Sequence, residues 1–204
     1  MPTISIDQKL LASLLSKHGC DHDIADVEHR LPLLGTDIDR CDEEVLDIEI
    51  FPNRPDLLSA ETLSVAMRAF LHNQRIHSEE VLDSSGIAVS VDSEIGSIRP
   101  VILGAVVRGL VMADDQEMDS FIKQLMEHQE KLHFALGRGR RRASIGVHDL
   151  STLHPPFKVR AVNRNHKFIP LAMDEEISIE EILSNHPKGV EFAHLLQGME
   201  RVPI

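Results

Sequence analysis

The stretch FPNRPDLLS, residues 51–59, lies between an apolar strand pattern and an amphipathic helix pattern. Pro52 and Pro55 each fix φ and push the residue before them toward extended backbone, so the strand must stop and the chain must turn. Ser59 is then a good N-cap for the helix that follows. The stretch predicts a rigid corner, and we expect a structural role for four of its residues, Pro52, Arg54, Pro55 and Asp56.

Strand and helix patterns alternate around this corner. Residues 2–6 read as a short strand, and apolar residues alternate with acidic ones over 46–50, which predicts a half-buried strand. Asp7 and Asp23 are expected as N-caps of two further helices. Over 63–71 apolar residues recur at i, i+3, i+4, i+7 and i+8, the spacing of an amphipathic helix. Together these patterns predict a small N-terminal α/β domain.

The polar segment 72–86 ends in Ser-Ser-Gly and is the best candidate for a linker. Beyond it, β-branched runs and a long helical stripe that ends at Gly137, the expected C′ glycine, predict a second, mixed α/β domain. The chain is therefore expected to be of the α+β or α/β class. The predicted boundaries are 1–80 for the first domain, 81–87 for the linker and 88–204 for the second domain. Strands are predicted at 87–91, 101–111, 143–147 and 157–162, and helices at 118–136, after the capping-box pair Ser178 and Glu181, and at 190–197.

Composition narrows the possible partners. The 204 residues carry a formal net charge of −12, whereas proteins that grip phosphate backbones are usually basic. Trp and Tyr are absent, which leaves few side chains for base stacking, so any RNA contact is expected to be confined to one patch. No apolar run approaches the roughly 18 residues of a membrane span, and no signal-peptide pattern opens the chain. Cys20 and Cys41 have no CxxC spacing and are interpreted as reduced thiols of a cytoplasmic protein.

The one basic cluster follows the predicted long helix. A helix C-terminus favours cations, so a solvated positive turn is one interpretation. The alternative is a phosphate contact for the acceptor end of a tRNA, which the clustering in an acidic chain favours. The candidate tRNA-binding residues are Arg138, Arg140, Arg141 and Arg142.

His148 and Asp149 are candidate contributors to a hydrolytic site. A histidine beside a carboxylate at a strand end can act as a general base or orient a water molecule. Neighbouring residues on a strand point to opposite faces, so a structural role for each side chain stays open. The chain has no HExxH motif, no finger spacing of Cys and His and no Walker-type loop, and we expect no metal site.

Five ordered blocks of the chain resemble the N-terminal region of the β subunit of phenylalanyl-tRNA synthetase, in its archaeal and eukaryotic form. The first, within 31–71, contains LPLLGTDID and DIEIFPNRPDLLSAETLSVAMRAFL and includes the proline corner. Because the blocks keep the family's order and cover nearly the whole chain, the resemblance is specific. The other four are RPVILGAVVRGL (99–110), QEKLHFALGRGRRRASIGVHDL (129–150), PPFKVRAV (155–162) and HPKGVEFAHLL (186–196).

The resemblance implies part of a phenylalanine-tRNA ligase. In that family the α subunit activates phenylalanine with ATP and joins it to tRNA, so ATP and Mg²⁺ are implied for the full enzyme and no cofactor is expected within this chain. The β subunit supplies structure, tRNA contacts and an editing domain. Tyrosine only adds a hydroxyl to phenylalanine, and a hydrophobic pocket rejects such an isostere poorly. A second site must therefore hydrolyse misattached tyrosine.

The implied partners are the synthetase α subunit, within an α2β2 heterotetramer, and tRNA(Phe), with neither DNA nor a membrane among them. By this resemblance 1–80 correspond to the family's small N-terminal domain and 88–204 to the first part of its editing domain. The family's main hydrolytic residues are expected past Ile204. The catalytic residues are therefore unknown, with only His148 and Asp149 as candidates.

Two other functions stay open on the sequence alone. One is a free-standing tRNA-editing or tRNA-binding factor related to the β subunit, and the other is a non-catalytic interaction module. The end of the chain, 201–204, shows no polar tail and no closing element, which we interpret as truncation. Without a phosphate-cradling loop, the chain alone is expected not to aminoacylate tRNA.

Overall fold

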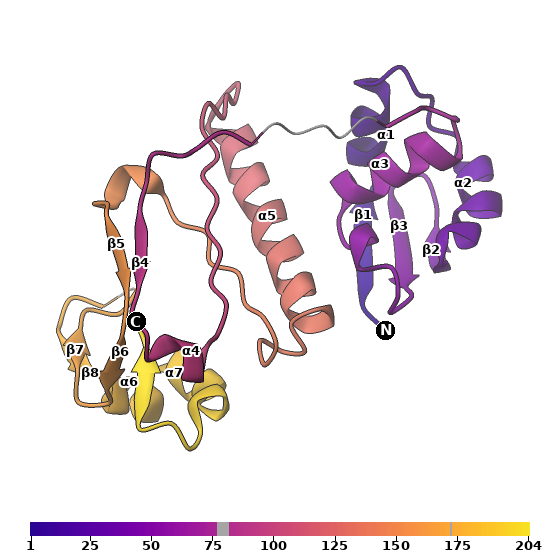
Figure 1. The fold of residues 1–204 in the computed structure, drawn as a ribbon. Helices are drawn as coiled ribbons and strands as arrows, with labels where there is room; N and C mark the ends of the chain where they lie inside the picture. The colour runs from indigo at the N-terminus through magenta and orange to yellow at the C-terminus, as the bar shows by residue number, and fades with distance from the viewer. Residues whose placement is uncertain (77–81, 172) are drawn as a thin grey trace. The chain divides into compact units, whose positions relative to one another are not determined.

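The computed structural model describes residues 1–76, 82–171 and 173–204 (Figure 1). Two compact units are each built from two separate stretches of chain: Met1–Glu80 with Val111–Gly146, and Val81–Leu110 with Val147–Ile204. The predicted domains were contiguous, and their functional division stays a prediction. Residue 81 of the predicted linker lies outside the described residues.

The first unit contains a three-stranded antiparallel sheet in the order β1-β3-β2 (Figure 1). The central strand β3 buries Leu46, Ile48 and Ile50 and leaves the residues between them partly exposed. Ile48 pairs with Ile4 on one side and with Ile38 on the other. The predicted half-buried strand is therefore confirmed. The strands are β1 (Thr3–Asp7), β2 (Thr36–Cys41) and β3 (Val45–Ile50).

The helices of this unit begin at the predicted caps. The Asp7 carboxylate accepts two backbone N–H groups at 2.7 and 3.1 Å, and that of Asp23 accepts one at 2.9 Å. Ser59 and Thr62 form a capping box, which satisfies N–H groups that a helix start leaves without partners. The elements are α1 (Gln8–Ser16), α2 (Ile24–Arg30), α3 (Ala60–Phe70) and the 3-10 turns η1 (Leu31–Leu34) and η2 (Pro55–Leu57).

One apolar core joins the sheet to these helices. Leu11 and Leu15 of α1, Leu63 and Met67 of α3, and Leu46 of β3 are fully buried in it. Leu132 and Ala135 from the end of the later helix α5 (Asp115–Ala135) pack against the same core. The first unit thus closes its core with residues from both of its stretches of chain.

Gly137, after α5, has a different role from the one predicted. It is not among the glycines with positive φ, so it is not a left-handed C′ residue. A Cβ on Gly137 would instead lie 2.5 Å from the carbonyl oxygens of His133 and Ala143. The chain needs glycine here because two backbone segments approach closely.

The second unit is built from three two-stranded pairings and short helices (Figure 1). Strand β4 pairs in parallel with β5, while β6 with β9 and β7 with β8 are antiparallel. The buried cluster of this unit consists of Val162, Ile179 and Val202. The strands are β4 (Val89–Val91), β5 (Phe157–Val159), β6 (Ala161–Asn163), β7 (Lys167–Phe168), β8 (Ile177–Ser178) and β9 (Arg201–Pro203). The helical elements are α4 (Ile95–Ile98), η3 (Leu150–Thr152), α6 (Ile179–Asn185), α7 (Pro187–Phe192) and η4 (Ala193–Leu196).

Local signals were again the most accurate here. The capping box of Ser178 and Glu181 is confirmed at the start of α6. The strand predicted at 157–162 is present but broken at Arg160 into β5 and β6. The helix predicted at 190–197 begins earlier, at Pro187, and changes to a 3-10 turn at Ala193.

Three other expectations were wrong. The apolar runs 101–111 and 143–147 are not strands, because neither pairs with another segment among the described residues. The final residues do contain a closing element, since Val202 of β9 pairs with Val162 of β6.

No helix in the described parts of the chain has both the length and the apolar character needed to cross a membrane.

Candidate functional site

The proline corner is fixed by one arginine. Arg54 donates from Nε and Nη2 to the two oxygens of Asp56, at 3.0 and 2.7 Å, and from Nη1 to the backbone carbonyl of Leu34. Gly35 lies beneath it with φ of 91°, and a Cβ there would be 3.0 Å from the Arg54 Cγ. The corner is therefore tied to the turn before β2.

Electrostatics of the corner follow from this forked pair. The hydrogen bonds from Arg54 hold the pKa of Asp56 below its ordinary value of 3.8. Arg54 itself has φ of −120° and ψ of 53°, outside the helical region but short of the extended backbone that was predicted before Pro55. The hydrogen bonds of Arg54 hold the corner in position. A structural role for Pro52, Arg54, Pro55 and Asp56 stays a prediction.

The arginine cluster lies on a closed turn after α5. Arg138, Gly139 and Arg140 all have left-handed φ, at 49°, 61° and 65°. Non-glycine residues in this region are uncommon and strained, so surrounding contacts must hold Arg138 and Arg140. The backbone carbonyl of His133 accepts the N–H groups of Gly139 and Arg140 at 2.9 and 3.3 Å. We name residues 137–142 the arginine turn.

Side chains of α5 hold the segment that follows the arginine turn. The buried His133 accepts the Ile145 N–H through Nε2 at 2.8 Å, and Gln129 donates to the Ile145 carbonyl. An accepting Nε2 places the proton of the neutral ring on Nδ1, which lies 3.4 Å from a Glu130 oxygen. These contacts replace the sheet hydrogen bonds that a strand at 143–147 would have made.

The four arginines differ in their surroundings. Arg140 is turned toward α5 and forms an ion pair with Glu130. Arg138, Arg141 and Arg142 are exposed at the helix C-terminus. The turn thus contains three exposed arginines, while Arg140 anchors it to α5. Binding of tRNA by these residues stays a prediction.

The pair His148–Asp149 is not assembled as a base and its orienting group. Asp149 caps the 3-10 turn η3 by accepting the Ser151 N–H at 2.9 Å, and no hydrogen bond joins it to His148 among the described residues. Hydrogen bonds from the Ser151 side chain and backbone keep the pKa of Asp149 below its ordinary value. Both side chains are exposed, and their editing role stays a prediction.

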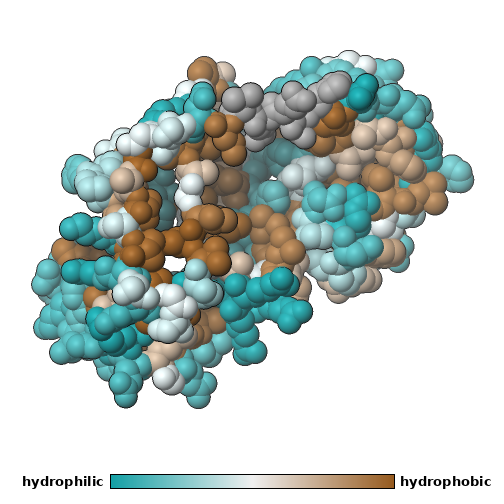
Figure 2. Space-filling view, viewed as in Figure 1, coloured by the Kyte–Doolittle hydropathy of each residue, from teal (hydrophilic) through white to brown (hydrophobic). Residues whose placement is uncertain are grey.

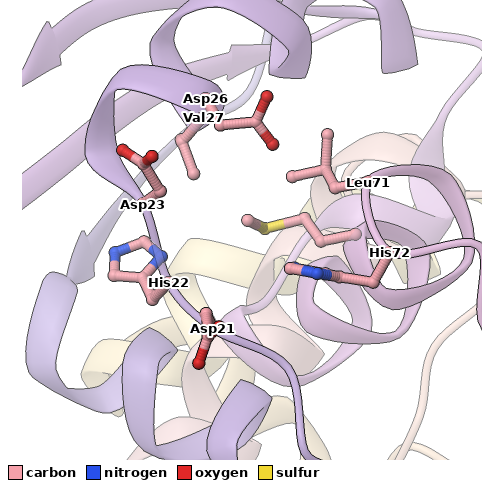
Figure 3. Close-up of a pocket in the computed structure, with 8 residues that line it drawn as sticks. Asp21, His22, Asp23, Asp26, Val27, Leu71 and His72 are labelled. Carbon is pink, nitrogen blue, oxygen red and sulfur yellow. The ribbon is translucent and has the colours of Figure 1, made fainter.

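A small cavity near the start of α2 was not found from the sequence (Figure 3). His22 donates from Nε2 to the Gln8 oxygen at 2.7 Å, because the Gln8 amide nitrogen itself donates to the Asp42 carbonyl at 2.9 Å. Burial lowers the pKa of His22, while Asp23 opposes this and His72 adds to it. The cavity is lined by Asp21, His22, Asp23, Asp26, Val27, Met67, Leu71 and His72.

The size of this cavity limits its use. Its volume of about 60 Å³ suits one or two water molecules and excludes an amino acid or a nucleotide. His22 and His72 are fifty positions apart, so no spacing in the sequence could have indicated that they meet. Among the described residues, no three His, Cys, Asp or Glu side chains are grouped to hold a metal ion.

An open hollow of about 370 Å³ lies in the second unit, beside Arg164 and His194. The Arg164 guanidinium donates to the carbonyls of Met199 and Leu196, at 2.9 and 2.7 Å, and to Glu180 at 3.3 Å. Its hydrogen bonds hold the loop before β9 in place. This arginine is therefore explained by the fold rather than by a ligand.

Comparison with known proteins first defines the class. No family model matches the chain. The fold matches a crystal structure of an N-terminal fragment of the phenylalanyl-tRNA synthetase β subunit from Pyrococcus horikoshii, with a TM-score of 0.82 and 29% sequence identity. The match covers 99% of this chain and 57% of that one. The chain thus has the fold of the N-terminal part of a synthetase β subunit.

Curated relatives then identify the chain. Phenylalanine-tRNA ligase β subunits of Methanosarcina barkeri, Methanococcoides burtonii and Archaeoglobus fulgidus are 44%, 41% and 39% identical to it over all 204 residues. The chain is a homologue of the N-terminal region of archaeal phenylalanine-tRNA ligase β subunits, which confirms the resemblance drawn from the sequence. It spans 36% of the length of each of these relatives.

Proposed function

We propose that this chain acts as the N-terminal region of a phenylalanine-tRNA ligase β subunit. The observation that carries the proposal is the 39–44% identity of β subunits across all 204 residues. In the assembled cytoplasmic enzyme, an α2β2 heterotetramer, this region supplies structure, packs against other parts of the synthetase and contributes part of the domain that hydrolyses misattached tyrosine. The α subunit uses ATP and Mg²⁺ to join phenylalanine to tRNA(Phe).

Neither alternative function is favoured. The relatives that are 39–44% identical over all 204 residues are β subunits, which favours the β-subunit role over a free-standing editing factor. A non-catalytic interaction module describes part of what such a region does within the enzyme. The β-subunit role includes it and explains more of the chain.

A chimeric subunit tests this role. In it, the present chain replaces the matching region of the M. barkeri β subunit, which is 44% identical, and the product is assembled with that enzyme's α subunit. We expect phenylalanylation of tRNA(Phe) and hydrolysis of Tyr-tRNA(Phe). A chimera that assembles but does neither would contradict the proposal. Phenylalanine-dependent ATP–pyrophosphate exchange by the 204-residue chain alone would contradict the division of labour.

Within this role, the arginine turn contacts tRNA phosphates. The support is the clustering of exposed arginines on a strained turn that several backbone hydrogen bonds hold in place. The acidic remainder of the chain repels phosphate and leaves the turn as a localised basic patch. Arg140 contributes by anchoring the turn through Glu130.

The salt dependence of tRNA binding distinguishes arginines that contact tRNA phosphates from arginines that are only solvated positive charges. Changing Arg138, Arg141 and Arg142 together to Gln in the chimeric enzyme should reduce the log–log salt slope by about 2–3, since each phosphate contact accounts for about 0.7–0.9. The matched control changes three exposed cations elsewhere, Lys17, Arg75 and Lys158, to Gln and removes the same charge. If the two triple variants have equal salt slopes, the arginines of the turn act only through their general charge and do not contact tRNA phosphates directly.

A further inference from the structure

One residue of α5 holds the arginine turn and the segment after it at two separate points. The backbone carbonyl of His133 accepts the N–H groups of Gly139 and Arg140, at 2.9 and 3.3 Å. The ring of the same residue accepts the Ile145 N–H through Nε2 at 2.8 Å. The two arginines that follow Arg140 lie between these points, so the backbone that carries them is fixed on both sides.

The ring of His133 has a fixed place because it is buried. It is 4% exposed, and its neighbours Leu132 and Ala135 pack against the core of the first unit. Ring Nδ1 has no hydrogen-bond partner among the described residues, although a Glu130 oxygen lies 3.4 Å away. An unpaired buried polar atom destabilises a fold, and an aliphatic side chain at this position would avoid that loss. What the ring adds is therefore the acceptor at Nε2.

Two further side chains of α5 strengthen the same two points. Glu130 forms its ion pair with Arg140, and Gln129 donates to the Ile145 carbonyl. The arginine turn lies at the lower end of α5 in Figure 1, and hydrophilic side chains gather there in Figure 2. The turn is thus a polar surface on a backbone that α5 keeps in one shape.

A fixed backbone favours binding of phosphates by arginine. A guanidinium group binds phosphate most strongly through two parallel hydrogen bonds, so its orientation contributes to the affinity. A loop that must be ordered on binding loses conformational entropy, and a loop that is already held loses less. The contacts of His133 therefore increase what each arginine of the turn can contribute.

We infer that His133 is a positioning residue for tRNA, which holds the arginine turn in the shape in which Arg138, Arg141 and Arg142 contact phosphates. Its own side chain is buried and acts only through the turn. The inference rests on the proposed contact between the turn and tRNA, and it names the residue on which that contact depends.

Two substitutions separate the acceptor of His133 from its bulk. His133→Phe keeps a buried ring without the acceptor, whereas His133→Gln places an amide oxygen near the position of Nε2. In the chimeric enzyme, His133→Phe should reduce the log–log salt slope of tRNA binding by about 2–3, as the change of the three arginines does. His133→Gln should restore most of the slope.

Hydrogen exchange reports the turn itself. In the chimeric enzyme, the Ile145 amide should exchange at least about 10-fold faster in His133→Phe than in the unchanged protein, and nearly normally in His133→Gln. The matched control is His128→Phe, on the same helix, since His128 makes no hydrogen bond in the described part of the chain. It should change neither the exchange nor the salt slope.

Combined variants distinguish the ways in which the inference can fail. Adding His133→Phe to the triple arginine variant should change the slope no further, because His133 acts through those arginines. A normal slope for His133→Phe beside a reduced slope for the triple variant would overturn the inference and leave the tRNA contact intact. If the triple variant behaves as its control does, the tRNA contact is wrong and the inference fails with it.

A general loss of structure would give a different result. Equal losses of slope in His133→Phe and His133→Gln would overturn the inference, because the acceptor would then not matter. If His133→Phe does not assemble, His133→Asn replaces it with the same expected results, since its amide is one methylene shorter than that of Gln and does not reach the Ile145 N–H.

Discussion

The two units of the molecule use apolar residues in opposite ways. Among the described residues, the first unit gathers sixteen into one buried cluster, whereas the buried cluster of the second unit has three. The second unit instead exposes a run of β-branched residues, 101–110, and both faces of β4. Apolar content alone therefore does not make a core, because the first unit also supplies the partners that cover its apolar faces.

This contrast indicates that the two units differ in how completely they are packed. In the first unit the helices cover the apolar face of the sheet, and local contacts fix the corner and the helix caps. The second unit has only two-stranded pairings and a buried cluster of three residues among the described residues. The following variants test whether the first unit is indeed the more tightly packed.

The largest effect is expected in the first core. Leu63→Ala removes a fully buried side chain of α3 and should lower the free energy of unfolding by about 2–5 kcal/mol, because the cavity only partly collapses. Leu183 packs at the edge of the second cluster, so Leu183→Ala should lower the free energy of unfolding by less than about 1.5 kcal/mol. Urea unfolding monitored in each unit measures both. Equal losses would remove the contrast between the two cores.

A backbone substitution beneath the corner should come next. Gly35→Ala faces both a left-handed φ and a 3.0 Å contact with Arg54, so it should cost more than about 1 kcal/mol. Gly19→Ala is the control, since its φ of 69° is also left-handed but its Cβ would meet nothing within 4 Å. The difference in unfolding free energy between the two variants reports the Arg54 contact. If Gly19→Ala costs as much, the corner does not constrain Gly35.

The ion pair of the corner should contribute modestly and depend on pH. Asp56 is 58% exposed, so solvent screens the pair and Asp56→Asn should cost about 0.5–1 kcal/mol at pH 7. Its pKa is lowered by Arg54, so the folded state favours the ionised carboxylate. The stabilisation is present above the ordinary pKa of 3.8 and is lost as pH falls through the lower folded value. A stability gap between wild type and variant that persists near pH 2 would contradict this origin.

The smallest effect is expected from a proline. Pro55 begins the 3-10 turn η2, and Pro55→Ala should cost about 0.4–1 kcal/mol by enlarging the unfolded ensemble. Pro187 begins α7 in the second unit and gives the matched control, with a similar cost expected. Thermal unfolding of both variants measures this. A loss at Pro55 of several times that at Pro187 would mean that the corner has stabilising contacts beyond its backbone restraint.

Local chemistry explains why some of this fold was predictable from sequence. Asp7, Asp23, Ser59 and Ser178 cap helices as expected, because a cap is decided within a few residues. The runs 101–111 and 143–147 were mistaken for strands because β propensity does not supply a partner, and the second run is held by side chains of α5 instead.

The candidate sites show the same division. The Arg54–Asp56 pair lies within one turn and could be foreseen, while the link from Leu34 to Arg54 depends on the fold. His133 was missed, although a histidine beside Leu132 on the buried stripe of a helix is a usable signal. The meeting of His22 with Gln8 had no sequence signal at all.

Native-state hydrogen exchange across the whole 204-residue chain tests the contrast between the units most directly. The account predicts the slowest amides in β3 and α3, opening only with global unfolding, and exchange at least about 100-fold faster throughout β4, β5 and α6. Comparable protection in both units, with a single shared opening free energy, would contradict it.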